Sequence, residues 1–122
     1  MKQEFYETYI IDVPDFPKPG IIFKDIGPSL ENKECFIPLI DDMADRLKDI
    51  NFDKIICADA RGFLFGAALA YKMNKGVVIT RKPGKLSRPG THASYALEYG
   101  TAELFISEGS ILPNEKVILV DD

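Results

Sequence analysis

The chain ends on two adjacent carboxylates, Asp121 and Asp122, directly after the apolar run of residues 117–120. Four consecutive apolar residues predict a strand that is buried on both faces, as in a parallel sheet. In open α/β sheets, ligands bind at the carboxyl ends of the strands. Adjacent carboxylates repel each other, so ribose hydroxyls or a bound cation would explain their placement there. The alternative is a solvated strand end without a ligand.

A second candidate site is the segment Asp59-Ala60-Arg61-Gly62, between a predicted strand (residues 54–58) and a predicted helix (residues 63–73). The first turn of a helix attracts anions through its N–H groups and its dipole. Arg61 adds a guanidinium that can bind an oxyanion through two hydrogen bonds. The alternative is a tight turn that carries a surface arginine.

A third candidate is the basic segment of residues 81–90, which contains no acidic residue. It suits either a mobile loop that grips phosphate or a basic turn that is only solvated. Together with Arg61 and the terminal acids, it would surround one sheet edge with the groups that a phosphorylated sugar requires. Cations would bind its phosphates, and carboxylates would bind its hydroxyls. Its cations are Arg81, Lys82, Lys85 and Arg88, interspersed with Pro83, Gly84, Pro89 and Gly90.

Two further residues have functional and structural interpretations. Phe23 follows a proline-rich stretch and offers a face on which a planar base could stack, or it is an ordinary core phenylalanine. Glu98 lies near a predicted hairpin turn, where a carboxylate on a closing loop could transfer a proton. The alternative for Glu98 is an exposed charge on a strand.

The elements that must position these residues follow from periodicity and from turn residues. The unit of residues 54–80 alternates strand, helix and strand, which predicts parallel strands joined by a crossover helix. The sequence therefore predicts an α/β fold with a mainly parallel sheet flanked by helices. The other predicted elements are a helix over 3–10, an extended loop over 12–20, a strand over 21–26, a helix over 33–50 with Asn32 as N-cap, and strands over 91–99 and 102–107 joined by a turn at Gly100-Thr101.

Length and composition narrow the class of protein. A chain of 122 residues predicts one domain, and a net charge of −4 argues against nucleic acid as a partner. Cys35 and Cys57 lie in apolar segments without a CxxC spacing, which indicates reduced thiols in a cytoplasmic protein. No signal peptide is evident, and the longest apolar run, residues 63–71, is too short to cross a membrane. One histidine and two separated cysteines leave no protein-built zinc site.

Five motifs, in order along nearly the whole chain, resemble those of the adenine phosphoribosyltransferases, members of the type I phosphoribosyltransferases. The resemblance implies a type I fold with a flexible hairpin loop, in which residues 1–30 of the single domain 1–122 form a hood over the base. The motifs are PDFPKPGIIFKDI (residues 14–26), ARGF (60–63), RKPGKL (81–86), YALEYG (95–100) and VDD (120–122).

The resemblance also implies an activity. The protein would join adenine to 5-phosphoribosyl 1-pyrophosphate, giving AMP and pyrophosphate, in purine salvage. Mg²⁺ would bridge the sugar and the pyrophosphate without direct protein ligands, and the protein would form a homodimer. Three alternatives remain open: a phosphoribosyltransferase for another purine, a ligand-sensing regulatory module on the same fold, and an impaired fragment that binds a base weakly.

The same resemblance implies roles for individual residues. The backbone of Ile22 would read the edge of adenine, Phe23 would pack on its face, and Lys24 stands where the family often has arginine. Glu98 and Tyr99 would lie on the catalytic loop, with Glu98 near the imidazole edge of adenine. Pyrophosphate would be bound by Ala60, Arg61, Arg81, Lys82 and Lys85, with a cis peptide bond in the loop of Arg61, and the ribose 2′- and 3′-hydroxyls by Asp121 and Asp122.

In the family, the two acids precede a turn rich in Ala, Thr and Gly that binds the 5′-phosphate, then a helix, a further strand and an apolar residue that closes the adenine pocket. The sequence stops at Asp122. We therefore expect an incomplete domain whose C-terminal part is missing, and impaired catalysis by the chain as written.

Overall fold

The computed structural model describes residues 2–97 and 100–122, which fall into two compact units. The first unit contains residues 1–43 and the second contains residues 44–122. The boundary lies within one helix, α3 (Lys33–Leu47). The predicted arrangement of one domain with residues 1–30 as a hood over the base stays a prediction.

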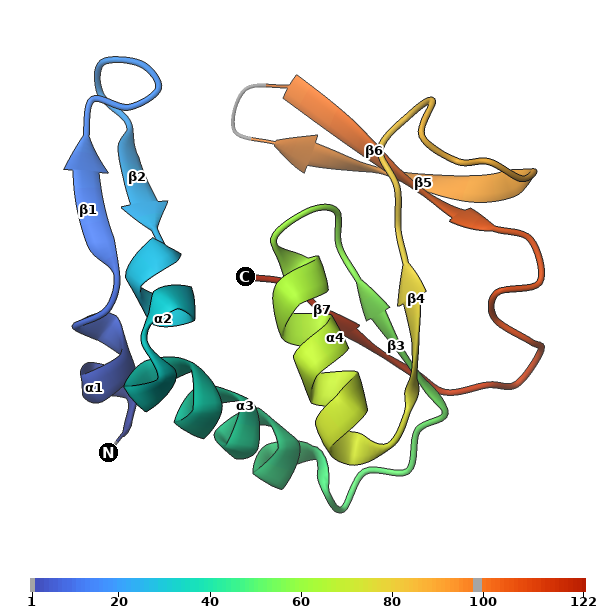
Figure 1. Ribbon diagram of the computed structural model, residues 1–122. Helices are drawn as coiled ribbons and strands as arrows, with labels where there is room; N and C mark the ends of the chain where they lie inside the picture. Colours follow the sequence, from blue (N-terminus) through green and yellow to red (C-terminus); the bar gives the residue numbers. More distant parts are fainter. Residues whose placement is uncertain (1, 98–99) are drawn as a thin grey trace. The chain divides into compact units, whose positions relative to one another are not determined.

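The first unit is organised around an antiparallel pair of strands (Figure 1). The pairing runs from Ile11 opposite Asp25 to Pro14 opposite Ile22. The segment before the strands is joined to the segment after them, because the Ser29 hydroxyl donates to the Tyr9 carbonyl (3.1 Å). The elements of this unit are α1 (Lys2–Glu7), β1 (Ile11–Pro14), β2 (Ile22–Asp25), α2 (Gly27–Glu31) and most of α3.

The proline-rich stretch differs from the prediction, because its first residues form β1 and only the rest is loop. Proline excludes a helix, but Pro14 is the last residue of β1, where a missing N–H interrupts no interior ladder bond. The loop then turns back to β2, with the Asp15 carboxylate accepting the Gly20 N–H (2.9 Å). Gly20 has a φ of +87°, which favours glycine at this turn.

A short helix, α2, was not predicted; it directly follows the residues expected to form a strand over 21–26. Proline fits the first turn of a helix, where its missing N–H would have no partner. Asn32 directly precedes α3, at the N-cap position that the sequence predicted, but its side-chain amide is bonded to another helix. Its side-chain amide donates to the Pro28 carbonyl at the end of α2 (2.8 Å), while its backbone carbonyl accepts the N–H groups of Cys35 and Phe36 at the start of α3 (both 2.9 Å).

Two helices are shorter than predicted. α1 ends at Glu7, where the Thr8 hydroxyl bonds back to the Phe5 carbonyl (2.6 Å) and competes with the helical pattern. α3 ends at Leu47, and Ile50 lies in the following turn with half of its surface exposed. The helix predicted over residues 33–50 therefore ends at residue 47.

The second unit contains a three-stranded parallel sheet with the order β4-β3-β7 (Figure 1). The three strands are aligned without a stagger, since Lys54 of β3 lies opposite both Gly76 of β4 and Val117 of β7. All three carboxyl ends therefore meet at one edge. This confirms the predicted βαβ unit, which consists of β3 (Lys54–Cys57), α4 (Gly62–Met73) and β4 (Gly76–Ile79), while β7 spans Val117–Val120.

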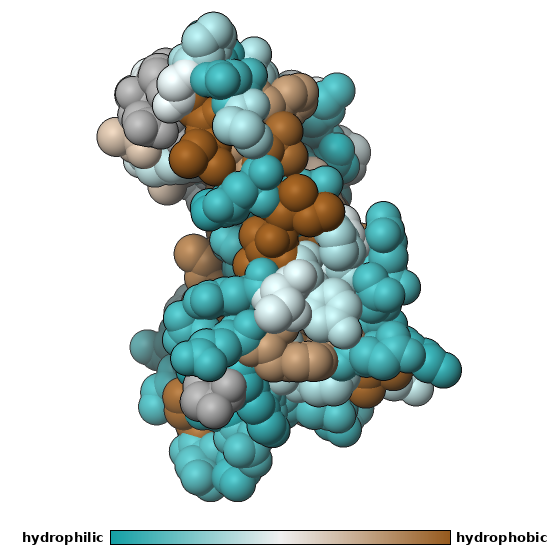
Figure 2. Space-filling model, turned by 90° about the vertical axis from the view of Figure 1, so that its left-hand side faces the viewer, coloured by the Kyte–Doolittle hydropathy of each residue, from teal (hydrophilic) through white to brown (hydrophobic). Residues whose placement is uncertain are grey.

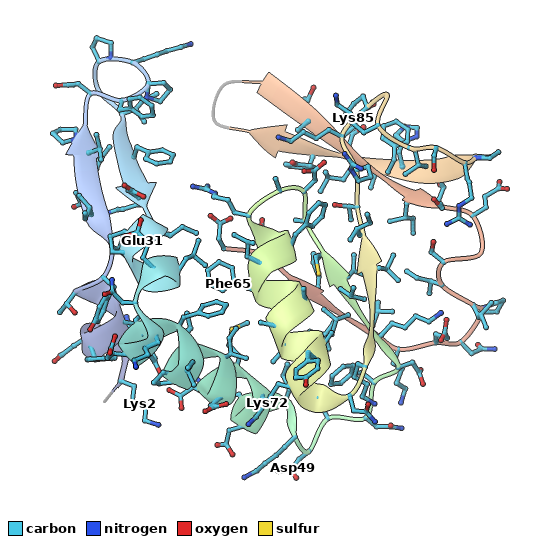
Figure 3. The ribbon with its side chains drawn as sticks, in the orientation of Figure 1. Lys2, Glu31, Asp49, Phe65, Lys72 and Lys85 are labelled. Atoms are coloured by element: carbon cyan, nitrogen blue, oxygen red, sulfur yellow. The ribbon has the colours of Figure 1, made fainter. Side chains whose placement is uncertain are left out.

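Helix α4 covers one face of this sheet and contacts all three strands. Gly66 allows the close approach, because a Cβ there would lie 1.9 Å from the Cys57 sulfur. Phe65, labelled in Figure 3, is buried on the same helix, and Leu69 is fully buried. α4 ends at Met73, as predicted, and Asn74 caps it in the left-handed conformation (φ 57°, ψ 47°).

Strand β7 is not buried on both faces, which corrects the prediction. Val120 is 5% exposed, but Leu119 is 67% exposed. The two side chains point to opposite faces because successive residues of a strand alternate. α4 covers one face, and among the described residues β7 pairs only with β3. Burial of an apolar strand therefore depends on neighbouring elements that its own residues do not specify.

The remaining strands, β5 (Gly90–Leu97) and β6 (Gly100–Ser107), form an antiparallel hairpin. The predicted turn at Gly100-Thr101 is wrong, because Gly100 pairs with Leu97 and already belongs to β6. The hairpin is joined to the end of β4 through a bridge in which Arg81 and Phe105 exchange two backbone hydrogen bonds of 2.8 Å.

Within the described residues, no helix combines the length and the apolar character needed to span a membrane. The face in Figure 2 shows hydrophobic atoms scattered among hydrophilic ones. Exposed apolar side chains occur in both units, among them Ile22 of β2 (59%) and Ile79 of β4 (46%).

Candidate active site

The carboxyl edge of the parallel sheet brings the Arg61 loop and the terminal acids together. The Arg61 Nε atom lies 2.7 Å from the Asp122 Oδ2 atom. The backbones are also close, since the Ala58 N–H donates to the Val120 carbonyl (3.1 Å). Gly62 fits between them without a side chain, because a Cβ there would lie 2.9 Å from the Val120 oxygen and 3.0 Å from the Asp121 Oδ1 atom. Two segments that the sequence singled out separately thus form one site.

The Arg61 loop contains a cis peptide bond between Asp59 and Ala60, at the place that the resemblance implied. α4 begins at Gly62, but two N–H groups of its first turn are already used. Phe63 donates to the Ala60 carbonyl (3.1 Å), and Leu64 donates to the Arg61 carbonyl (3.2 Å). An anion at this helix end would therefore be bound mainly by the Arg61 guanidinium and the helix dipole.

The end of β4 is tied to the same loop through Asp59 and Thr80. The Thr80 hydroxyl donates to the Cys57 carbonyl and accepts the Asp59 N–H, both at 3.0 Å. The Asp59 carboxylate in turn accepts the Lys82 N–H (3.1 Å) and the Arg81 Nε–H (3.4 Å). Arg81 and Lys82 are therefore placed at the sheet edge that also carries Arg61.

The two terminal acids differ in their surroundings. Burial raises the pKa of Asp121 above its usual range, and the adjacent Asp122 carboxylate adds to this, while the Arg61 charge acts in the opposite direction. The Asp122 side chain is 16% exposed and forms the ion pair with Arg61. The pair of acids is thus close to one cation at the carboxyl edge of the sheet.

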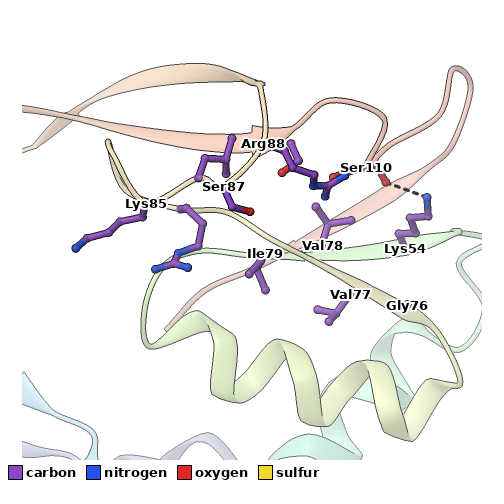
Figure 4. Close-up of a pocket in the computed structure, with 12 residues that line it drawn as sticks. Lys54, Gly76, Val77, Val78, Ile79, Lys85, Ser87, Arg88 and Ser110 are labelled. Atoms are coloured by element: carbon purple, nitrogen blue, oxygen red, sulfur yellow. Dashed lines mark hydrogen bonds between the residues drawn. The ribbon is translucent and has the colours of Figure 1, made fainter.

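A cavity of about 440 Å³ lies beside β4 and the basic segment (Figure 4). Val78 points to the side of the sheet on which Arg88 lies, whereas Val77 and Ile79 point toward α4. Lys85 and Arg88 line the cavity and form no ion pair with any residue that the structure describes. These two cations are available for an anionic ligand.

Lys54 and Arg81 also line this cavity, but each has an acidic partner. Lys54 pairs with Glu115 (2.9 Å) and donates to the Ser110 carbonyl (2.9 Å), and Arg81 pairs with Asp59. The Leu112 N–H and the Lys54 ammonium group lower the pKa of Glu115 below its usual range. Lys54 therefore fixes the segment before β7, and we assign it no ligand.

The residues implied for adenine lie in the first unit, on β2. Phe23 contacts Phe16 edge to face, with ring centres 5.4 Å apart and planes at 71°. The Lys24 ammonium group pairs with Asp12 (2.5 Å) on the neighbouring strand. Ile22 lies opposite Pro14, which has no N–H to donate to it. The Ile22 side chain is 59% exposed.

The proposed catalytic residues Glu98 and Tyr99 lie outside the described residues. Their roles stay predictions. For metals, the described part of the chain contains no cluster of three or more His, Cys, Asp or Glu residues. The oxygen donors at the site are the Asp121 and Asp122 carboxylates, the donor type that Mg²⁺ prefers.

Sequence reasoning missed Thr80, and it named Asp59 only as the first residue of the Arg61 segment, without a role of its own. Thr80 is only 5% exposed, although it is polar, and it follows the apolar run of β4 directly. Asp59 follows β3 in the same way, two residues beyond Cys57. A polar residue just past the carboxyl end of a parallel strand was the signal that could have identified both.

A parallel sheet whose carboxyl edge carries a cationic strand–loop–helix turn and an acid pair defines the type I phosphoribosyltransferase class. The comparison with solved structures confirms this predicted fold. The crystal structure of adenine phosphoribosyltransferase from Thermoanaerobacter pseudethanolicus matches with a TM-score of 0.92 and 45% identity, over 98% of this chain and 69% of that one.

Two solved complexes are also similar. The Saccharomyces cerevisiae adenine phosphoribosyltransferase, bound to an imino-altritol bisphosphate and adenine, matches with a TM-score of 0.87 and 34% identity, over 98% of this chain and 70% of that one. The Trypanosoma brucei enzyme, in complex with AMP, pyrophosphate and ribose-5-phosphate, matches with a TM-score of 0.87 and 26% identity, over 98% of this chain and 54% of that one.

Curated relatives match more strongly in sequence. The adenine phosphoribosyltransferase of Pseudothermotoga lettingae is 53% identical over 114 residues, which cover 93% of this chain and 67% of the relative. That of Thermosipho africanus is 52% identical over 115 residues, which cover 94% and 68%. No protein-family model matches the sequence. The chain spans about two thirds of the length of these relatives, and it belongs to the adenine phosphoribosyltransferase family.

Proposed function

We propose that this protein transfers the 5-phosphoribosyl group from 5-phosphoribosyl 1-pyrophosphate to adenine, giving AMP and pyrophosphate, as a step of purine salvage. The observation that carries the proposal is the 2.7 Å pair of Arg61 and Asp122, which puts a cation for phosphate and an acid for ribose at one sheet edge. Family membership supports the choice of adenine. So do the ligands of the two similar complexes, which include adenine, AMP and pyrophosphate.

In the proposed reaction, an imidazole nitrogen of adenine attacks the anomeric carbon of the ribose. The bond from that carbon to the pyrophosphate oxygen breaks, and pyrophosphate leaves with the bonding electrons. Positive charge builds on the ribose and negative charge on the leaving group. Fixed donors aimed at developing charge stabilise such a transition state more than mobile water does. We assign this role to Arg61, Arg81, Lys82 and Lys85, with the backbone of Ala60.

The carboxylates have two proposed roles. Asp121 and Asp122 accept hydrogen bonds from the ribose hydroxyls and fix the sugar relative to the leaving group. Glu98 accepts the proton that adenine loses on forming the new bond, directly or through water, and Tyr99 lies beside it in sequence. Replacing Glu98 by Gln would lower turnover while leaving the affinity for pyrophosphate unchanged.

We assign the adenine contacts to Ile22, Phe23 and Lys24. The exposed strand position of Ile22 supports a backbone contact with the edge of the base. Phe23 offers an aromatic face, and its edge-to-face contact with Phe16 holds the ring orientation. Lys24 has a compact ammonium group, so its contribution would be a point charge and not a stacked plane.

We propose Mg²⁺ as the cofactor, bound through oxygen atoms of the sugar pyrophosphate and through water, without direct protein ligands. The acid pair would contact this ion only through its bound water, because Mg²⁺ keeps several waters when substrate phosphates are present. When bound, the ion would neutralise charge on the departing pyrophosphate.

We further propose a cytoplasmic homodimer. The thiols support the location, since Cys35 and Cys57 are free and fully buried, and burial raises the pKa of both. The exposed apolar side chains of Val77 (41%) and Ile79 (46%) on strand β4 support a contact between copies. Sedimentation of the purified chain measures this state, and a monomer at micromolar concentration would contradict it.

Calorimetry tests the proposed substrates. We expect adenine to bind more tightly than hypoxanthine or guanine, and 5-phosphoribosyl 1-pyrophosphate to bind in the presence of Mg²⁺. The Arg61→Ala variant serves as the control, since it should lose affinity for the sugar pyrophosphate and keep its affinity for adenine. Preferential binding of hypoxanthine or guanine would contradict the choice of base. An absence of binding by the sugar pyrophosphate would contradict the transferase assignment.

A further inference from the structure

The cationic groups proposed for pyrophosphate come from two segments that are far apart in the sequence. Arg61 lies on the loop after β3, whereas Arg81 and Lys82 follow β4. A pyrophosphate group binds well only when its donors are held at a fixed separation, because loose donors lose conformational entropy on binding. Some feature of the fold must therefore set the distance between these two segments.

Thr80 links the two segments through one hydroxyl group. It donates to the Cys57 carbonyl and accepts the Asp59 N–H, both at 3.0 Å, and the Thr80 N–H also donates to the Cys57 carbonyl (3.0 Å). The side chain is 5% exposed, so water has little access to these bonds. Such protected bonds hold backbone groups more firmly than bonds at the surface.

Asp59 transmits this constraint to the basic segment. Its carboxylate accepts the Lys82 N–H (3.1 Å) and the Arg81 Nε–H (3.4 Å), and its side chain is 10% exposed. Asp59 also begins the loop that carries Arg61 two residues later. The backbone N–H of Asp59 is thus bonded to the Thr80 hydroxyl, and the Asp59 carboxylate is bonded to Arg81 and Lys82 of the basic segment.

We propose that Thr80 is a positioning residue for pyrophosphate: its hydroxyl fixes Asp59, and Asp59 sets the separation between Arg61 on one side and Arg81 and Lys82 on the other. Thr80 itself does not touch the ligand. The inference rests on the proposed function, because it specifies how that site achieves its affinity for pyrophosphate. It assigns a role to a hydroxyl and not to the volume of the side chain.

Two substitutions separate the hydroxyl from the volume. Thr80→Val keeps the shape of the side chain and removes both hydroxyl bonds, so the Asp59 N–H loses its acceptor. Thr80→Ser keeps the hydroxyl and removes a methyl group. We expect the affinity for magnesium pyrophosphate to fall about five- to tenfold in T80V, as for the loss of about one net hydrogen bond, and to stay within about twofold in T80S.

The experiment is calorimetric titration of the wild-type chain and both variants with magnesium pyrophosphate and, separately, with adenine. Adenine affinity should be equal in all three, since the hydrogen bonds that the structure gives Thr80 are to Cys57 and Asp59, which have no proposed role in binding the base. Thermal unfolding establishes that each variant is folded at the titration temperature. Rescue by serine, together with a loss confined to pyrophosphate, is a result that a merely structural role for Thr80 would not give.

Other outcomes overturn the inference. Equal pyrophosphate affinity in T80V and wild type would exclude a positioning role, and an equal loss in T80V and T80S would assign the effect to packing. Failure of the wild-type chain to bind magnesium pyrophosphate would instead refute the proposed pyrophosphate site itself.

A second measurement needs no variant. Amide hydrogen exchange of the wild-type chain should show protection of the Asp59 N–H, and the protection should increase when magnesium pyrophosphate is bound. This measurement applies even if T80V does not fold. An Asp59 amide that exchanges as fast as an open loop amide would contradict the bond to Thr80 and the inference with it.

Discussion

The Arg61 Nε atom lies 2.7 Å from the Asp122 Oδ2 atom, so the proposed pyrophosphate donor and the proposed ribose acceptor neutralise each other before either meets a ligand. The Asp122 side chain is 16% exposed and that of Arg61 is 48% exposed. A ligand that binds Arg61 must therefore share the guanidinium with Asp122 or displace it. The two halves of the site are coupled through this pair.

The coupling predicts opposite effects of Asp122→Asn on two ligands. Pyrophosphate alone should bind about two- to fivefold more tightly, because removing one charge of a partly exposed pair frees Arg61 at the energy typical of such pairs. The sugar pyrophosphate should bind more weakly, because a ribose hydroxyl loses its charged acceptor. Calorimetry with both ligands measures the two changes. If both affinities moved in the same direction, the pair would not couple the sites.

The raised pKa of Asp121 predicts that this carboxylate lowers stability at neutral pH. A carboxyl group whose pKa is higher in the folded chain than in the unfolded chain favours folding when protonated, and this contribution is lost as the pH rises through the folded pKa. Asp121→Asn should therefore raise the melting temperature at pH 7, but only slightly, because Asp121 is exposed and solvent screens its charge. The difference should vanish at a pH below the pKa of an unfolded aspartate.

The same substitution should weaken binding of the sugar pyrophosphate, since an amide is a poorer acceptor for a ribose hydroxyl. Thermal unfolding at both pH values, with calorimetry at pH 7, measures the two effects. A stability gain that persisted unchanged in acid would show that the burial of Asp121 is not its cause.

Phe23 should contribute to adenine binding through its aromatic face. We expect Phe23→Leu to weaken adenine binding about tenfold, the size of one aromatic stacking contact with a base. Phe16→Leu is the matched control, because it removes the edge-to-face partner 5.4 Å away and leaves Phe23 in place. Its effect should stay below about threefold. Equal losses in the two variants would indicate that the aromatic pair supports the strands and does not select the base.

Gly66 should be intolerant of any side chain. A Cβ at this position would lie 1.9 Å from the Cys57 sulfur and 3.0 Å from the Cys57 Cβ, so Gly66→Ala forces α4 away from β3. Overpacking of this kind costs about 1–3 kcal/mol or more, measured as the free energy of unfolding in denaturant. Because α4 begins next to Arg61, the affinity for pyrophosphate should fall as well.

Two further variants control for the loss of glycine. Gly76→Ala places a Cβ where no atom lies within 4 Å, so its stability should match or slightly exceed that of the wild type. Adding Cys57→Ala to Gly66→Ala removes the sulfur and should restore part of the loss. A double variant as unstable as the sum of the two single ones would exclude this contact as the cause.

The sequence predicted the α/β class, the βαβ unit and the segments of the site because these depend on local chemistry. Apolar runs of strand length, the helix over residues 63–73 and cations without nearby acids are visible in the order of residues alone. The placement of Arg61, Arg81 and Asp122 at one edge also followed, because the carboxyl ends of parallel strands meet at the same side of a sheet.

Residues whose state depends on distant partners could not be predicted. Leu119 and Val120 are equally apolar, but only Val120 is buried, since α4 covers one face of β7. Asn32 stands at the predicted N-cap position of α3, but the bond of its side-chain amide to the Pro28 carbonyl depends on α2, a helix that was not predicted. The hairpin turn shifted because pairing of Gly100 with Leu97 sets the register of the two strands.

The sequence by itself determined which residues carry charge and which of these charged residues follow the end of a strand. Only the tertiary structure decided that Thr80 is bonded to Asp59 and that Arg61 is bonded to Asp122, across separations of 21 and 61 residues. Pattern and propensity act over one or two turns of chain. Contacts over longer separations form only when the packed sheet brings strand ends together.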